Sequence, residues 1–163
     1  MYNLGDQFKM SMERAKAKKE NMVIGNTYRF TVLTERLIRM EYSPKGIFYD
    51  QPSQLVLFRD FPHPEFTVRQ DDQFLEITTK YFKLEYSKGK SFNAGKLVPM
   101  NNLKVILQHS NPEKLWYYGH PEVRNFHGIF TSVDGDKSNQ MMQKGLYSPD
   151  GFVSFDDSVH MLF

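Results

Sequence analysis

The sequence of 163 residues contains no cysteine. A disulfide framework and a thiolate metal site are therefore excluded, and this composition suits a reducing compartment. No apolar run approaches the roughly 18 residues that a membrane-spanning helix needs. Residues 1–21 are too polar for a secretory signal. These absences lead us to expect a cytoplasmic protein that does not associate with a membrane.

A surplus of charge of one sign is also missing. The formal net charge is +2, and the first twenty residues hold all of it, with five Lys or Arg against three Asp or Glu. From residue 21 onward, sixteen basic residues balance sixteen acidic ones. Binding to a phosphate backbone requires clustered basic side chains, so we do not expect a nucleic-acid partner.

Motifs that signal catalysis or cofactor binding are absent too. The sequence has no Gly-x-Ser-x-Gly elbow, phosphate loop or dinucleotide fingerprint. Residues 134–138 open like a calcium loop, but Asn139 and Gly145 stand where that loop needs Gly and Glu. The histidines lack the neighbouring ligands of a zinc site; they are His63, His109, His120, His127 and His160. We therefore expect no metal and no other cofactor.

Aromatic residues, in contrast, reach 15% of the chain. From Met22 onward they belong to short segments in which apolar and polar side chains alternate, which is typical of strands with one buried face. These segments lie at residues 28–32, 38–42, 66–68, 75–77, 82–86 and 103–107, and turn-forming residues separate them. Short turns without intervening helices predict an all-β fold, most simply an antiparallel β-sandwich.

Both ends of the chain and one internal segment depart from this pattern. Residues 1–21 form a polar leader with weak helical character from Asp6 to Glu20, which we expect to be partly helical or disordered with little tertiary support. Residues 111–150 are rich in Gly, Pro, Asn and His and predict long functional loops, followed by a strand at 151–155. The apolar end at residues 161–163 predicts that residues 22–163 are one domain of a longer protein.

Carboxylates remain as candidates for acid–base chemistry. Asp156 and Asp157 are adjacent, so on a strand they would point to opposite faces and could not act as a pair. Asp150 precedes Gly151 at the start of the expected strand, where an Asp-Gly pair either forms a turn or reaches a ligand. These residues by themselves do not make a complete active site.

Several stretches stand out when they are taken in order. They are residues 28–42 (YRFTVLTERLIRMEY), 59–66 (RDFPHPEF), 81–86 (YFKLEY), 116–119 (WYYG) and 145–152 (GLYSPDGF), the last leading to Asp156-Asp157-Ser158. In this order and spacing they resemble the N-terminal β-sandwich domain of glycoside hydrolase family 31, which contains α-glucosidases and α-xylosidases. The resemblance runs from about residue 22 to the end of the chain.

This resemblance implies a sandwich similar to the galactose mutarotase type, followed by a catalytic (β/α)₈ barrel. Hydrolases of the family retain configuration through two aspartates, about 5–5.5 Å apart in retaining enzymes. Both aspartates belong to the barrel, so the resemblance assigns no catalytic residue to this chain. It does imply that a loop of this domain lines the substrate pocket, and the residues it points to are Asp150, Tyr147 and Trp116.

Two departures from the family pattern concern this loop. Pro149 stands where the family often has Arg, and residues 125–128 (NFHG) replace a common Asn-Leu-Gly-Gly. An altered pocket wall changes substrate preference, so the resemblance leaves the glycoside and its linkage open.

Two functions follow as hypotheses. The first is the N-terminal domain of a retaining α-glycosidase, inactive when isolated, which packs on its own C-terminal barrel and helps to bind an α-linked oligosaccharide. Without the barrel, apolar surface near Tyr117, Phe126 and Phe155 would be exposed and promote self-association. The alternative is a stand-alone carbohydrate-binding or interaction sandwich, in which Trp116, Tyr117 and Tyr118 either stack on a pyranose ring or belong to the core.

Overall fold

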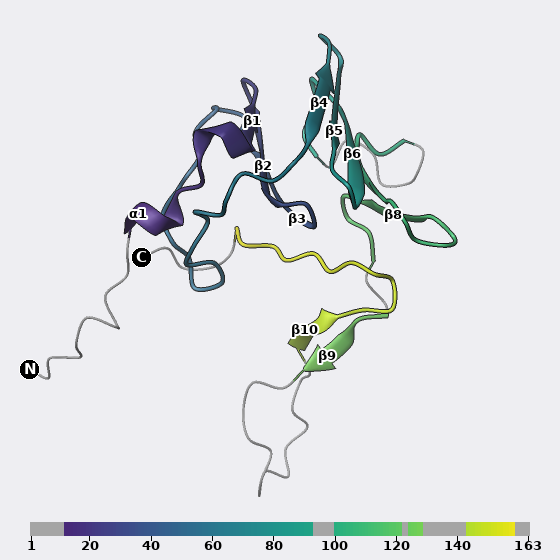
Figure 1. The fold of residues 1–163 in the computed structure, drawn as a ribbon. Coiled ribbons are helices and arrows are strands. Elements are labelled where there is room, and N and C mark those ends of the chain that lie inside the picture. Colours follow the sequence, from purple (N-terminus) through teal and green to yellow (C-terminus); the bar gives the residue numbers. More distant parts are fainter. Residues whose placement is uncertain (1–11, 93–99, 122–123, 129–142, 159–163) are drawn as a thin grey trace, which may run out of the picture.

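The computed structural model describes residues 12–92, 100–121, 124–128 and 143–158, and these form an all-β fold (Figure 1). A single α-helical turn and a 3₁₀ turn precede the strands in the described part of the chain. In chain order the elements are α1 (Met12–Ala15), η2 (Lys19–Asn21), β1 (Met22–Ile24), β2 (Tyr28–Thr34), β3 (Leu37–Tyr42), β4 (Thr67–Gln70), β5 (Phe74–Thr78), β6 (Phe82–Ser87), β7 (Leu103–Leu107), β8 (Lys114–Tyr117), β9 (Phe126–Gly128) and β10 (Gln143–Tyr147).

The strands form two main antiparallel sheets, arranged as a sandwich. One sheet has the order β1-β2-β3, and the other has the order β4-β5-β6-β7-β8. Within each sheet, strands that follow one another in the chain pair with each other. A separate two-stranded ribbon contains β9 and β10. The predicted antiparallel β-sandwich is therefore confirmed.

Aromatic side chains fill the space between the two sheets. The ring of Tyr86 on β6 lies 5.1 Å from that of Tyr28 and 5.3 Å from that of Phe30, both on β2. Phe92 completes this cluster, with its ring centroid 5.7 Å from Phe30 and 5.5 Å from Tyr86. Edge-to-face contacts and one stacked pair, Phe30 with Phe92, stabilise the core beyond the burial of area alone. The aromatic excess of the sequence thus has a structural cause.

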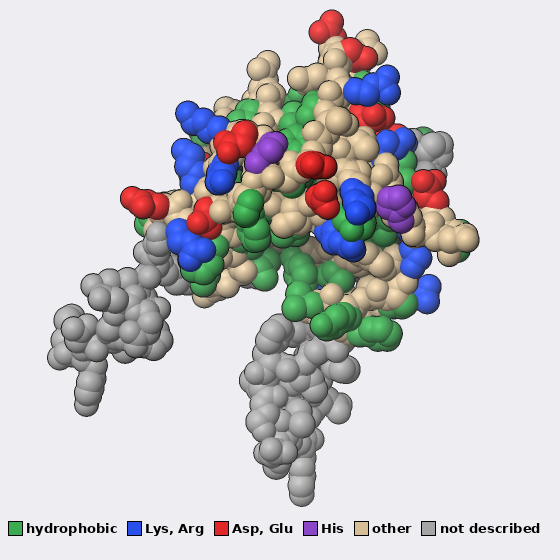
Figure 2. All heavy atoms as spheres, in the orientation of Figure 1, with side chains coloured by type: hydrophobic (Ala, Val, Ile, Leu, Met, Phe, Trp, Pro, Cys, Tyr) green, Lys and Arg blue, Asp and Glu red, His purple; other side chains and the backbone are tan. Residues whose placement is uncertain are grey.

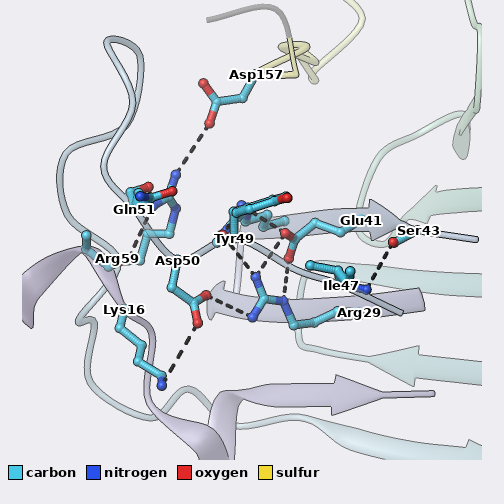
Figure 3. Close-up of polar contacts among 12 residues, drawn as sticks. Lys16, Arg29, Glu41, Ser43, Ile47, Tyr49, Asp50, Gln51, Arg59 and Asp157 are labelled. Carbon is cyan, nitrogen blue, oxygen red and sulfur yellow. Dashed lines mark hydrogen bonds and ion pairs between the residues drawn. The ribbon is translucent and has the colours of Figure 1, made fainter. Parts of the chain in front are cut away.

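Strand β2 is covered on both faces. Its inward side chains belong to the core, but Arg29 and Thr31, which point the other way, are also buried. The connection between β3 and β4 accounts for this cover near Arg29, whose guanidinium lies 5.1 Å from the ring of Phe48 and within 2.8 Å of Asp50 (Figure 3). The long β3–β4 connection therefore acts as an additional layer over the smaller sheet.

Arg29 is the centre of a polar cluster beneath this layer. Its Nε donates to Glu41 Oε2 at 2.6 Å and its Nη2 donates to Glu41 Oε1 at 2.9 Å, while Asp50 binds Nη1 (Figure 3). Burial alone would lower the pKa of Arg29, but the hydrogen bonds and charges of Glu41 and Asp50 outweigh it and raise the pKa. The buried cation is therefore fully compensated.

Three expectations from the sequence need correction. The segment at 111–150 is not loop throughout: it contains β8, which pairs with β7, and β9 and β10, which pair with each other. No strand forms at residues 151–155; the chain there is extended and held by side-chain contacts, such as Phe152 against the ring of His120 at 5.2 Å. The described half of the leader is partly helical, as expected, but it has more tertiary support than expected, since Ala15, Ala17 and Asn21 are buried. Residues 1–11 lie outside the described part.

No helix in the described part of the chain is long and apolar enough to cross a membrane. The expected calcium-like turn at residues 134–138, His160 and the apolar end of the chain lie outside the described residues.

The buried Tyr86 hydroxyl makes stability sensitive to alkaline pH. Burial raises the pKa of Tyr86 to about 12, with smaller contributions from Tyr42 and Tyr28. In the unfolded chain the same hydroxyl ionises near pH 10, so the unfolded state releases this proton first as the pH rises. The stabilisation is complete below pH 10, and about 3 kcal/mol of the free energy of unfolding is lost as the pH approaches 12.

Urea unfolding of the wild type and Tyr86→Phe at a series of pH values measures this loss. We expect Tyr86→Phe to lose about 1 kcal/mol at neutral pH, because its hydrogen bond to the Lys90 carbonyl disappears, and to show a shallower alkaline decline. Tyr49→Phe, at a residue 60% exposed, should decline like the wild type. If the free energy of unfolding fell equally steeply above pH 10 in the wild type and in Tyr86→Phe, the assignment of this loss to Tyr86 would be contradicted.

Candidate functional site

Asp150 lies in a tight turn that follows β10. The backbone N–H of Gly151 donates to the Ser148 carbonyl at 3.1 Å, and the N–H of Asp150 donates to Ser148 Oγ at 3.1 Å. Pro149 occupies the second position of this turn, where its fixed φ is favourable. Gly151 has φ +81°, a conformation that other residues rarely adopt. The turn expected from the Asp-Gly pair is confirmed.

The carboxylate of Asp150 is held from its own segment and from Arg124. Its Oδ1 accepts a hydrogen bond from Arg124 Nη1 at 3.1 Å, and its Oδ2 lies 3.5 Å from Ser148 Oγ. The Asp150 side chain is 18% exposed and that of Arg124 is 62% exposed. Lys114 Nζ on β8 also donates to the Pro149 carbonyl, so the larger sheet supports the turn directly. Asp150 is thus a positioned, partly accessible carboxylate with acceptor capacity left for a ligand.

Tyr147 lies at the end of β10, on a ribbon with little cover. It pairs with Phe126 on β9, and Tyr147, Leu146 and Phe126 are 76%, 75% and 64% exposed. Neighbouring side chains of β10 are thus largely open to solvent. Hydrophobic side chains gather at this lower edge of the molecule in Figure 2.

The apolar surface expected on the 111–150 segment and the terminal segment is present at two of its three named positions. Phe126 is largely exposed and Phe155 is 43% exposed. Tyr117, in contrast, is partly buried, with its ring 4.9 Å from that of His120. Self-association through this surface stays a prediction.

Trp116 does not join Asp150 and Tyr147 on the surface. It pairs with Val105 on β7, faces the core and is only 7% exposed. Tyr118 is more accessible, at 42%, but its ring packs 5.8 Å from Phe92. The structure therefore brings together Asp150 and Tyr147 from the predicted set, and it places Trp116 in the core.

The segment that carries Asp150 is anchored at its far end by a buried arginine. Arg59, only 1% exposed, binds Asp157 through Nη2 at 3.4 Å (Figure 3). Its Nη1 donates to the carbonyls of Ala15 and Gln51 at 3.1 and 3.0 Å. Ser53 Oγ donates to the other oxygen of Asp157 at 2.6 Å. The final segment is thereby tied to the leader and to the β3–β4 connection.

The two adjacent aspartates have separate roles in this arrangement. Asp157 contacts Arg59 and Ser53, whereas Asp156 accepts hydrogen bonds from the backbone N–H and the hydroxyl of Ser158. Asp156 and Asp157 were expected to point apart because side chains alternate along a strand. They do not lie on a strand, so this reason is wrong. In the described residues, no three His, Asp or Glu side chains come together as a metal site would require.

Sequence reasoning missed the partners that position these residues. Arg124 lies 26 positions before Asp150, and Arg59 lies 98 positions before Asp157, so no local pattern links them. One signal for the Arg59–Asp157 contact was present in the sequence. Residues 59–66 and 156–158 both belong to the stretches that resemble the glycosidase family.

The Arg59–Asp157 pair should contribute more to stability than a surface pair. Asp157→Ala leaves a buried guanidinium without its carboxylate, and we expect it to lower the free energy of unfolding by about 2 to 3 kcal/mol. Asp60→Ala breaks the exposed pair with Arg14, with side chains 54% and 38% exposed, and should cost less than about 1 kcal/mol. Urea denaturation of both variants checks this, and equal losses would refute the anchor.

Comparison with known proteins does not place the chain in a family. No model of a protein family matches the sequence, and no curated protein matches it either. Its function has therefore to be inferred from its own residues, above all from the Asp150 turn and the ribbon beside it.

Proposed function

We propose that this chain is the N-terminal, non-catalytic β-sandwich of a retaining α-glycosidase similar to those of glycoside hydrolase family 31. In that enzyme it packs on the catalytic barrel and contributes a loop to the pocket for an α-linked oligosaccharide or glycoside. The stretches quoted from the sequence support this proposal, and the antiparallel sandwich is the architecture that they imply. The absence of cysteine agrees with the cytoplasm as the location of such an enzyme.

The observation that carries the proposal is the Asp150 turn beside uncovered apolar side chains. A rigid turn presents a carboxylate, and next to it Tyr147 and Leu146 are about three-quarters exposed. Exposed apolar side chains that are grouped in this way mark surfaces that another domain or a ligand covers. A barrel packed there would bring the Asp150 carboxylate to the rim of its pocket.

Asp150 would act in such a pocket by binding. Because Arg124 already occupies one of its oxygens, the carboxylate is suited to accept hydrogen bonds from sugar hydroxyls rather than to attack carbon. The nucleophile and the general acid/base belong to the barrel in this proposal. The alternative, a stand-alone binding sandwich, loses one of its three stacking residues, since Trp116 is buried.

Hydrolysis assays on aryl α-glucosides test whether catalysis belongs to the barrel and not to this domain. We expect no turnover by the purified 163-residue chain, because both catalytic aspartates are assigned to the barrel. The same chain extended by the coding sequence that follows Phe163 should hydrolyse these substrates with retention of configuration. Turnover by the short chain would sink the proposal, and so would a stop codon directly after Phe163, which would favour the stand-alone sandwich.

Variants of the extended protein test the pocket loop. We expect Asp150→Asn to lower kcat/KM by about 10-fold or more, mainly through a higher KM, since a hydrogen bond to a charged group contributes about 1.5–3 kcal/mol. Tyr147→Ala should act in the same direction. The matched control is Asp72→Asn, at an exposed position between β4 and β5, which should leave both constants unchanged. Unaltered kinetics for Asp150→Asn would remove this loop from the site.

A further inference from the structure

A hollow of about 360 Å³, open to solvent, lies where three connections of the sandwich meet. The turn between β2 and β3 forms one side, residues 62–64 of the β3–β4 connection form another, and Tyr81 between β5 and β6 forms the third. It is shallow and open on its outer side, so a ligand bound there would keep one face in solvent. The hollow shares no residue with the Asp150 turn.

Buried hydrogen bonds fix the walls of this hollow. Thr79 is 4% exposed, and its hydroxyl donates to the Glu35 carbonyl at 2.8 Å, which joins the β2–β3 turn to the larger sheet. Asn21, fully buried, donates from Nδ2 to the Phe61 carbonyl at 3.4 Å and so holds the segment that leads to Pro62. The three connections are therefore preformed, which reduces the cost of binding a ligand.

Asn21 also orients the ring of His63. Because its Nδ2 donates to Phe61, its Oδ1 faces His63 Nδ1 at 2.7 Å. A carbonyl oxygen can only accept, so His63 Nδ1 carries the hydrogen and Nε2 of the neutral ring is an acceptor. His63 thus offers the hollow an imidazole held in one tautomer by a buried side chain.

Arg36 supplies donors next to Tyr81. Its guanidinium lies 3.5 Å above the ring of Tyr81 and forms no ion pair with the described residues. An arginine stacked on an aromatic face is preorganised, and its N–H groups along the edge stay available. Glu35, which also lines the hollow, adds a carboxylate that accepts. The rest of the lining includes apolar Leu33, Pro62 and Pro64.

We propose that this hollow binds a neutral saccharide. Its polar rim combines donors on Arg36 with acceptors on His63 and Glu35, and a sugar hydroxyl both donates and accepts. The C–H face of a pyranose ring matches the apolar prolines and Leu33. A simple anion would meet the Glu35 carboxylate, and an apolar ligand would leave the polar rim unpaired. This inference does not rest on the proposed glycosidase function, because it uses other residues and needs no catalytic domain.

Titration of the ¹⁵N-labelled 163-residue chain tests the proposal. Maltotriose, cellotriose and xylotriose are added separately up to about 50 mM, which covers millimolar affinities. We expect at least one of them to shift the amide signals of residues 33–36, 63 and 81. The absence of shifts with all three, shifts confined to residues 147–151, or shifts at the hollow with inorganic phosphate alone would each overturn the proposal.

Side-chain variants locate the binding. Arg36→Gln keeps the exposed turn and removes the guanidinium, so we expect it to bind the saccharide at least 10-fold more weakly. We expect the same loss of affinity for His63→Phe. The matched control is Arg69→Gln, whose side chain on β4 is 83% exposed outside the hollow and should bind as the wild type does. Unchanged affinity of Arg36→Gln would refute the site. If the 163-residue chain binds a saccharide but the extended protein hydrolyses none of the glucosides, this inference stands and the glycosidase proposal fails.

Discussion

A charged group that water cannot reach has to be satisfied by the protein, and the guanidinium of Arg59 is such a group in this fold. Its partners come from three parts of the chain: the Ala15 carbonyl, the Gln51 carbonyl and the Asp157 carboxylate. These segments must therefore be in place together. The sandwich supplies the core, and the Arg59 cluster, together with Ser53, ties the leader and the final segment to it.

Both candidate sites follow from that organisation, in which irregular segments are fixed by a few buried polar contacts. The Asp150 turn lies on the segment that ends at the Arg59 contact, and Lys114 of the larger sheet supports it directly. The hollow beside Tyr81 depends in the same way on two buried polar side chains, Thr79 and Asn21. In each case buried polar side chains at or beyond the ends of the strands supply the support, and the connections carry the chemistry.

The sequence predicted the regular part of this fold well, because alternation along a strand is a local property. Residues 28–32 and 82–86 alternate clearly, and they became β2 and β6. The short strands β8 and β9 were not predicted within the loops expected at 111–150, since pairing with a neighbour decides whether three or four residues become a strand. The Asp150 turn could be predicted from its Pro and Gly, but its partner Arg124 could not, because nothing local marks a contact over 26 residues.

The ribbon of β9 and β10 pairs only with itself in the described part of the chain, and its exposed residues Leu146 and Phe126 contribute little burial to hold it. The free energy needed to open it is consequently small compared with that of the sandwich. A partner that recognises the paired ribbon must select that state from an equilibrium with opened ones. Its apparent affinity is scaled by the fraction of molecules in which the ribbon is closed, so a stiffer ribbon would bind more tightly without a single new contact.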